Sequence, residues 1–365
     1  MKLCLIYNFA QHYRAGIFKL LDRTFDCDFF FGKNTTDIKT MDYSLLHGNV
    51  TDLDVKKIGP IEYQCGVPSL AFKGYDAIVI LIDPKSISCW LLLLYCRLFS
   101  KTKIYGWTHG WYGKETKTRS ILKKLNFKLA DGLFLYGNYA KQLMIAEGFK
   151  QEKLHVIHNS LDYENQVEIR KHLSGSKLFT DHFNNDNKNL IFIGRLTPVK
   201  KLDMLVTAIK KLNDKGTRVN LTFVGDGSEA ELLKKQASQL GVEGQVWFYG
   251  ACYDDRKNAE LIYNADLCVA PGNVGLTAMH TMVFGTPVIT HDCFKWQMPE
   301  FESIMPGVTG DFFAYENQES METAIAKWFE THKDREETRL ACFKEIDDNW
   351  TPEFQIKVFK KVLTK

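Results

Sequence analysis

The sequence predicts an α/β protein built from two doubly wound domains, and three observations support this fold class. Short apolar runs typical of buried parallel strands alternate with helical patterns along the chain. The alternation falls into two series, separated by a polar stretch rich in Asn and Asp. The length of 365 residues also suits two domains better than one.

The first series lies in residues 1–165 and predicts an N-terminal Rossmann-like domain. Helical patterns at Ala15–Arg23 and Asn138–Glu147 separate some of the strands, and the apolar run Trp90–Phe99 reads as a core helix. That run is interrupted by Arg97 and is too short to span a bilayer. The expected strands are Lys2–Tyr7, Asp28–Phe31, Ala77–Ile82, Lys103–Trp107, Gly132–Tyr136 and Leu154–Ile157.

The second series predicts a C-terminal Rossmann-like domain over residues 190–345, after a linker at 166–189 whose part His172–Asn189 reads as a loop. A last segment, 346–365, begins a helix near Thr351-Pro352. The expected strands are Leu190–Ile193, Arg218–Val224, Val246–Tyr249, Leu267–Ala270 and Val288–Thr290. Ligands bind at the carboxyl ends of such strands, so we expect the two domains to face each other across a cleft.

Composition excludes several classes of protein and binding site. A net charge of +3 gives no reason to expect nucleic acid as a partner. Nine scattered cysteines include no C-x-x-C pair, and the strand expected directly after Met1 leaves no room for a leader, so we expect reduced thiols in the cytoplasm. Asp26-Cys27-Asp28 reads as a turn, and the adjacent His291 and Asp292 do not form a metal site by themselves.

The most informative stretch is residues 271–288. It follows the apolar run Ala265–Ala270 and contains Gly272 and Gly275, which allow a tight turn and a close approach to a ligand. A helix is expected from near Thr277 to Gly285. A glycine loop that feeds a helix N-terminus offers N–H groups to an anion, although a simple packing loop is an equal alternative.

A second candidate segment is Gly194–Lys201, which follows the expected strand Leu190–Ile193. Thr197-Pro198 has the sequence of a helix N-cap followed by the first helical residue. This would place Arg195 on the strand-end loop and Lys200 in the first helical turn. Two such cations beside a helix N-terminus are suited to a diphosphate.

Both segments resemble the retaining glycosyltransferases of family 4, which have the GT-B fold. In residues 271–288 the family pattern is matched at Val274-Gly275-Leu276, Met282, Gly285, Pro287 and Val288, whereas Gly272 and His280 replace its two glutamates. Gly194-Arg195-Leu196 with Lys200 resembles a second family motif, with Lys201 in place of its glycine. Val224–Glu229 resembles a third, although Gly225 also begins a weak dinucleotide fingerprint.

The resemblance implies roles for individual residues. Arg195 and Lys200 would hold the donor diphosphate, and His109, near the place where the family commonly has a histidine, would contact the donor sugar. His12, Tyr13 and Arg14 would line the acceptor side, and Glu300 or Glu302 would face the site, Glu302 having the matching distance to Gly307. His280 was expected in the first helical turn, beside a ribose hydroxyl. The remaining expected donor-binding residues are Gly225, Tyr249, Gly250, Asn273, Val274, Gly275 and Leu276.

The function implied is retaining transfer of a sugar from a nucleotide-sugar donor to a glycan or lipid-linked acceptor, in surface polysaccharide biosynthesis. No cofactor or bound metal is expected, because the cations replace a metal. The family's C-terminal tail commonly packs back on the first domain, which is expected for 346–365. Three alternatives stay open: a nucleotide-sugar 2-epimerase, a non-catalytic nucleotide-sugar-binding protein, and a dehydrogenase that uses the Gly225 motif.

One helix, Lys114–Lys128, carries six lysines and arginines among apolar residues. This basic amphipathic pattern is compatible with peripheral contact with the inner face of a membrane. A solvated basic surface is the equally weighted alternative.

Overall fold

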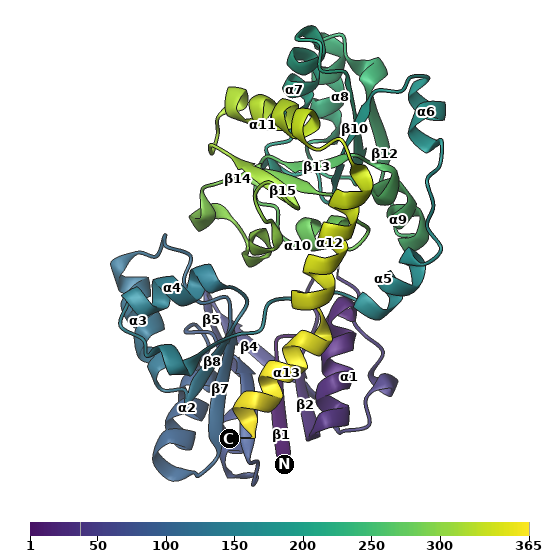
Figure 1. The fold of residues 1–365 in the computed structure, drawn as a ribbon. Coiled ribbons are helices and arrows are strands. Elements are labelled where there is room, and N and C mark those ends of the chain that lie inside the picture. Colours follow the sequence, from purple (N-terminus) through teal and green to yellow (C-terminus); the bar gives the residue numbers. More distant parts are fainter. Residues whose placement is uncertain (37, 365) are drawn as a thin grey trace. The chain divides into compact units, whose positions relative to one another are not determined.

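The computed structural model describes residues 1–36 and 38–364 and divides into two compact units (Figure 1). The first unit comprises Met1–Tyr163 together with Thr351–Lys365, and the second comprises Glu164–Trp350. Each unit contains a parallel sheet with helices, which is the predicted α/β class.

The first unit contains a seven-stranded parallel sheet in the order β3-β2-β1-β6-β7-β8-β9. The chain leaves β1 toward β2 on one side and later returns to β6 on the other, so the topological switch point lies between β1 and β6. The strands are β1 (Lys2–Tyr7), β2 (Asp26–Gly32), β3 (Val50–Leu53), β6 (Ala77–Leu81), β7 (Lys103–Thr108), β8 (Gly132–Leu135) and β9 (Leu154–Val156).

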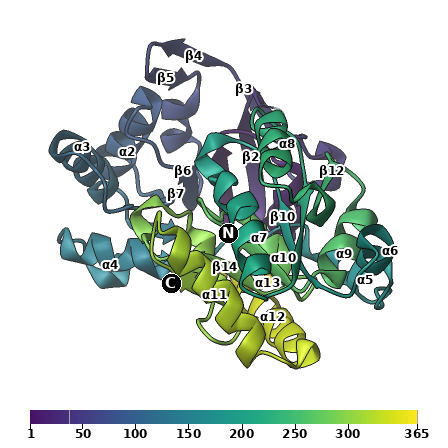
Figure 2. The ribbon, with the colours of Figure 1, turned by 90° about the horizontal axis from the view of Figure 1, so that it is seen from above.

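Helices cover both faces of this sheet. Figures 1 and 2 show α2 (Ile87–Phe99), α3 (Lys117–Lys128) and α4 (Asn138–Ala146) along one side. On the other face, α1 (Ala15–Thr24) packs against α13 (Pro352–Leu363), over a core that includes Trp107, Phe134 and Phe359. The last helix of the chain is therefore part of the first unit.

The second unit contains a six-stranded parallel sheet in the order β12-β11-β10-β13-β14-β15, with its switch point between β10 and β13. The strands are β10 (Lys188–Ile193), β11 (Val219–Val224), β12 (Val246–Gly250), β13 (Leu267–Ala270), β14 (Val288–His291) and β15 (Gly310–Phe313). The helices are α5 (Tyr163–Arg170), α6 (Leu178–Phe183), α7 (Asp203–Asp214), α8 (Ala230–Gln239), α9 (Asp255–Asn264), α10 (Leu276–Met282), α11 (Gln318–Thr331) and α12 (Arg335–Asn349).

Several local expectations are wrong. The expected loop His172–Asn189 contains α6, because Phe179 buries its ring beside Trp247 and gives the short helix an anchor. Asp26–Asp28 is not a turn but the beginning of β2, paired with β1. Strands β3 and β15, and the antiparallel hairpin β4 (Val55–Ile58) and β5 (Ile61–Gln64), were not expected. Among the described residues, no helix combines the length and apolarity needed to cross a bilayer.

Candidate functional site

The candidate site of the second unit lies at the carboxyl edge of its sheet, around the switch point. Arg195 follows β10 and is exposed, and Asn273 follows β13, the neighbouring strand. Parallel strands end at one edge, so the two loops predicted from the sequence lie together.

Two glycines allow the backbones of these loops to pack closely against one another. A Cβ on Gly225 would overlap the carbonyl oxygen of Gly194, and a Cβ on Gly272 would overlap that of Val199. Gly225 donates its N–H to the Gly250 carbonyl, and Gly272 donates its N–H to the Lys200 carbonyl at 2.9 Å. The structural reason for glycine at position 272 is therefore that two loops pack backbone to backbone, which the sequence did not indicate.

Lys200 is held in a defined position by Asn273. Its ammonium donates to the backbone carbonyl of Asn273 at 2.6 Å and to the Asn273 side-chain oxygen at 2.7 Å. Burial, and then the charge of Arg195, lowers the pKa of Lys200 to about 8, whereas Glu300 acts in the opposite direction. Asn273, expected to offer its amide to a sugar, uses its two oxygens to position the cation.

The helix expected at Thr197-Pro198 is shorter than the sequence suggested. Pro198–Lys200 forms one 3-10 turn, the Thr197 side chain makes no capping hydrogen bond, and α7 begins only at Asp203. Lys201 adopts a left-handed conformation between the two, with φ of 51°. This position is usually occupied by glycine, which accounts for the glycine of the family motif.

The start of α10 presents backbone N–H groups, but fewer than expected. Gly275 has φ of 53° and turns the chain into the helix. Val274 donates its N–H to the buried Gln297 side chain at 2.9 Å and is therefore not available to a phosphate, contrary to expectation. Within the described chain, the N–H groups of Gly275, Leu276 and Thr277 have no acceptor. Gln297 lies 23 residues away in sequence and no local pattern identified it.

His280 lies in the last turn of α10 and not in the first, so the expected influence of the helix N-terminus does not apply. Its Nδ1 lies 3.1 Å from the side-chain nitrogen of Gln166 on α5. Burial lowers the pKa of His280, so the ring is neutral at pH 7. The ring therefore accepts a hydrogen bond from Gln166, a residue that was assigned to the linker.

Two other expected donor-binding groups differ in their surroundings. Tyr249 and Gly250 end β12, where the Gly250 carbonyl is used by Gly225. Glu300 is 2% exposed and interacts with the charge of Lys200, whereas Glu302 is partly exposed. Of the two carboxylates left open by the sequence, Glu300 is thus shown to act on Lys200.

In the first unit, Arg14 is buried at the carboxyl edge of β1 and not on the surface. Its guanidinium lies 5.2 to 5.8 Å from the ring centres of Tyr7, Tyr13, Trp107 and Tyr136. Such an aromatic enclosure stabilises a cation at a site with little solvent. The sequence placed Arg14 on the acceptor side, and the structure adds the ring cluster that holds it.

His109 follows β7 at the same edge, with its ring centre 4.6 Å from that of Tyr136. Burial is the main reason that its pKa falls to about 4, with further lowering by Arg14 and Lys123. His109 is therefore a neutral imidazole at pH 7, suited to hydrogen bonding and not to carrying positive charge.

Beside these residues, a pocket of about 500 Å³ lies at the β1–β6 switch point. It is lined in part by Asn8, Gln64, Glu62 and Asp83, with hairpin β4–β5 contributing one wall. His12, also expected on the acceptor side, is exposed, and its Nδ1 lies 3.0 Å from the carbonyl of Lys39. His12 thus faces the Lys39 loop, and the pocket is the feature that the sequence did not reveal.

Among residues 1–36 and 38–364, no three His, Cys, Asp or Glu side chains gather closely enough to hold a metal ion. The expected basic helix begins at Lys117, capped by the side chain of Thr116, and not at Lys114.

Comparison with known proteins finds one family model that matches most of the second unit. Residues 176–341 match the model of the glycosyl transferases group 1. An uncharacterised glycosyltransferase of Methanocaldococcus jannaschii is 28% identical over 151 residues, which cover 38% of this chain and 36% of that relative. The chain thus matches only about a third of the length of this curated relative.

Solved structures match the chain over its full length. A lipopolysaccharide outer core galactosyltransferase has a TM-score of 0.73 at 16% identity, covering 100% of this chain and 99% of the other. Anabaena HepE in complex with UDP has the same TM-score and identity, covering 100% of both chains. At this identity the likeness establishes the fold, which is GT-B.

Proposed function

Because residues 176–341 match the model of the glycosyl transferases group 1 and the chain has the GT-B fold, we propose that it is a retaining glycosyltransferase that uses a nucleotide-sugar donor. The acceptor is a glycan or lipid-linked sugar in surface polysaccharide biosynthesis. The reaction requires neither a bound metal nor a cofactor. HepE binds UDP on the same fold, which supports a nucleoside diphosphate as the ligand class.

The observation that carries this proposal is the position of the Lys200 ammonium. Asn273 fixes it with two short hydrogen bonds beside the exposed Arg195, at the switch point of the sheet. The backbone N–H groups of Gly275, Leu276 and Thr277 at the start of α10 lie at the same edge of the sheet. Cations and N–H groups that are oriented before the ligand arrives are what an oligophosphate requires.

This edge has a direct role in the proposed chemistry. Breaking the anomeric C–O bond gives a sugar with oxocarbenium character and leaves negative charge on the departing diphosphate. Lys200, Arg195 and the N–H groups of Gly275 and Leu276 stabilise that charge, and one such donor contributes about 3 kcal/mol to lowering the barrier. The acceptor hydroxyl attacks from the face that the diphosphate leaves, which retains the anomeric configuration.

The first unit supplies the groups that act on the sugars. We assign neutral His109 to the orientation of the donor sugar, because a neutral imidazole both donates and accepts hydrogen bonds. The pocket lined by Asn8, Gln64, Glu62 and Asp83 offers amides and carboxylates, which pair with the hydroxyls of a glycan acceptor.

A thermal-shift screen of UDP-, GDP-, CMP- and dTDP-sugars tests the donor. A donor at 100 times its dissociation constant stabilises the folded protein by about 2.7 kcal/mol, which raises the melting temperature measurably. The selected donor is then incubated with an acceptor panel and the products are analysed. Absence of stabilisation by every nucleotide sugar and by every free nucleoside diphosphate would contradict the proposal.

Product analysis also separates the alternatives. A 2-epimerase would convert the donor sugar without any acceptor. A non-catalytic binding protein, suggested by Gly272 and His280 at the positions of the family glutamates, would be stabilised by the donor yet transfer nothing. Metal independence is tested with a chelator: loss of transfer that manganese restores would contradict it.

We also propose a cytoplasmic location, with α3 in contact with the inner face of the membrane. The support is its series of cations with exposed Ile121, Leu122 and Leu125 between them.

A further inference from the structure

The first unit has an exposed apolar surface that extends well beyond α3. Phe99 is 70% exposed, Leu98 64% and Phe72 58%, and on α3 Ile121 is 59% exposed. Isolated exposed apolar residues are common, but a contiguous group on neighbouring elements indicates a partner surface. We name it the α2–α3 surface; it comprises Phe72, Leu98, Phe99, Ile121, Leu122 and Leu125.

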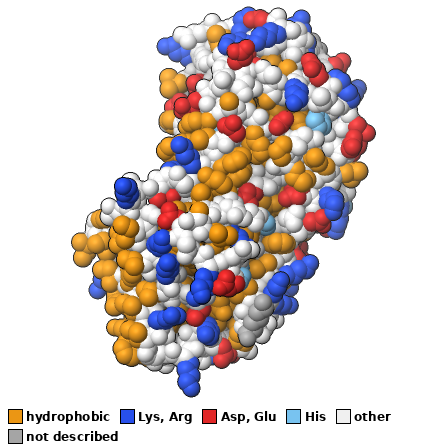
Figure 3. All heavy atoms as spheres, turned by 60° about the vertical axis from the view of Figure 1, so that its left-hand side comes forward, with side chains coloured by type: hydrophobic (Ala, Val, Ile, Leu, Met, Phe, Trp, Pro, Cys, Tyr) orange, Lys and Arg blue, Asp and Glu red, His pale blue; other side chains and the backbone are white. Residues whose placement is uncertain are grey.

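Ring and helix contacts join these residues into one surface. The Tyr95 ring lies 5.7 Å from Phe72 and 6.4 Å from Phe99, which forms an aromatic row at the end of α2. Figures 1 and 2 both show α3 beside α2. Figure 3 shows apolar side chains gathered on this unit with lysines and arginines beside them.

The charge around this surface is predominantly positive. Residues 84–129 contain ten lysines and arginines, and Glu115 is their only acidic residue. The segment thus carries +9, whereas the whole chain carries +3, so the remainder carries −6. Glu115 pairs with Lys123 at 2.9 Å and accepts the backbone N–H groups of Tyr112 and Gly113. Carboxylates outside the segment pair with two more of its cations: Asp131 with Lys103 at 3.8 Å and Glu147 with Lys124 at 3.7 Å.

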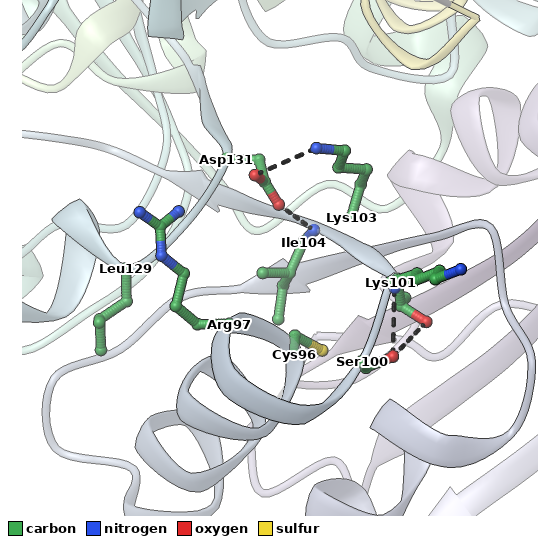
Figure 4. A pocket seen from close by; sticks show the side chains of 9 residues that line it. Cys96, Arg97, Ser100, Lys101, Lys103, Ile104, Leu129 and Asp131 are labelled. Carbon is green, nitrogen blue, oxygen red and sulfur yellow. Dashed lines mark hydrogen bonds and ion pairs between the residues drawn. The ribbon is translucent and has the colours of Figure 1, made fainter.

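A pocket of about 370 Å³ lies where α2 ends, beside Leu98 and Phe99 (Figure 4). Arg97, Lys101 and Lys103 contribute three cations, and Asp131 contributes one carboxylate. Asp131 lies 3.8 Å from Lys103 and accepts the N–H of Ile104 at 2.9 Å. Within the described residues, the side chains of Arg97 and Lys101 form no ion pair or hydrogen bond, which leaves two uncompensated cations at the pocket.

We propose that the α2–α3 surface docks on an anionic lipid bilayer and that the pocket at the end of α2 binds a lipid headgroup phosphate. Aromatic and aliphatic side chains enter the headgroup region, and the surrounding cations pair with anionic lipid. The Arg97 guanidinium, which Figure 4 shows reaching from α2 toward Asp131, is suited to forked hydrogen bonding with a phosphate. This inference rests on the membrane contact proposed for α3, and not on glycosyl transfer.

Vesicle flotation of the full-length protein tests the surface, with vesicles of phosphatidylcholine alone or mixed equally with phosphatidylglycerol. Wild-type protein is expected to float with the anionic vesicles only and to dissociate as salt is raised. Arg97→Gln with Lys101→Gln is expected to bind about 25-fold more weakly, because each cation near an anionic surface contributes about fivefold. The matched control, Lys234→Gln with Lys235→Gln on α8, is expected to bind like wild-type.

Two further substitutions test whether binding depends on the headgroup pocket and on the apolar side chains, or only on general electrostatic attraction to the bilayer. Arg97→Lys keeps the charge but loses the forked geometry, so weaker binding supports the pocket and wild-type binding overturns it. Leu98→Ser with Phe99→Ser is expected to weaken binding about tenfold, whereas Leu232→Ser, exposed on α8, leaves it unchanged.

Donor hydrolysis is measured in parallel and is expected to be unchanged in every variant, because none of the substituted residues belongs to the proposed donor site. Within the first unit, Arg97 and Lys101 lie near the amino end of β7, at the opposite edge of the sheet from His109. Failure of wild-type protein to bind anionic vesicles overturns the inference without affecting the proposed transfer. So does a solution dimer that the Leu98→Ser and Phe99→Ser changes dissociate, since a second copy would then occupy the surface.

Discussion

The two units have the same type of sheet but place their cations differently at the carboxyl edge. In the second unit, Arg195 is exposed, and two hydrogen bonds to Asn273 fix the Lys200 ammonium at the carboxyl edge of the sheet. In the first unit, Arg14 is enclosed by four aromatic rings, and the neighbouring His109 is kept neutral. An accessible, oriented cation suits an anion, whereas an enclosed cation beside a neutral imidazole suits a ligand that presents hydroxyls.

Lys200→Ala has the largest expected effect on the second unit. It removes an oriented cation from the proposed leaving-group site, so we expect donor turnover to fall about 10²- to 10³-fold. The neighbouring Lys201→Ala is the matched control, because Lys201 pairs with Glu316 at 2.6 Å instead. Similar turnover in the two variants, measured by release of nucleoside diphosphate, would show that Lys200 has no special role.

Gly272→Ala tests whether loop packing positions the cation. Its Cβ would overlap the backbone of Val199 and Lys200, so we expect the free energy of unfolding to fall by about 3 kcal/mol. Gly244→Ala is the control, since no atom lies within 4 Å of the added methyl group. Urea unfolding measures both, and equal stability of the two variants would contradict the packing described for Gly272.

The pH dependence of turnover tests the state of the same lysine. Its pKa is lowered to about 8, so the ammonium is mostly charged at pH 7 and loses its charge as pH rises through 8. We expect the rate to fall about tenfold for each pH unit above that value. Lys200→Arg should keep its charge and show no such fall, whatever its absolute rate; a shared alkaline fall would assign the titration to another group.

Arg14→Met has the smallest expected effect and tests the first unit. Removal of the Arg14 charge should raise the pKa of His109 above about 4, but burial, the larger cause, should keep it below 6.5. His109 therefore stays neutral at pH 7 in both proteins. NMR titration of the imidazole measures this, and a pKa unchanged from wild-type would show that Arg14 does not act on His109.

The sequence was most informative where function depends on local pattern. Apolar runs identified the central strands, and the strand-end positions of Arg195 and Lys200 followed from them. It was least informative where a contact joins distant residues. Gln297 accepts the N–H of Val274, and Gln166 donates to His280. Hairpin β4–β5 lines a pocket. No local periodicity or spacing in the sequence indicates any of these three contacts.

Contacts in the structure also show the surroundings of Gly272 and His280, which stand in place of the two family glutamates. Gly272 stands where the family has a glutamate because the loops around Lys200 approach too closely for any side chain. His280 lies in the last turn of α10, where its Nδ1 accepts a hydrogen bond from the Gln166 side chain. Neither fact follows from residue identity alone.

The central claim is that the second unit presents a ready-made diphosphate site, and calorimetry tests it most directly. The nucleoside diphosphate selected by the thermal-shift screen and its monophosphate are titrated into wild-type protein and Lys200→Ala. We expect the diphosphate to bind wild-type more tightly than the monophosphate, and Lys200→Ala to remove most of that preference. Equal preference for the diphosphate in both proteins would contradict the claim.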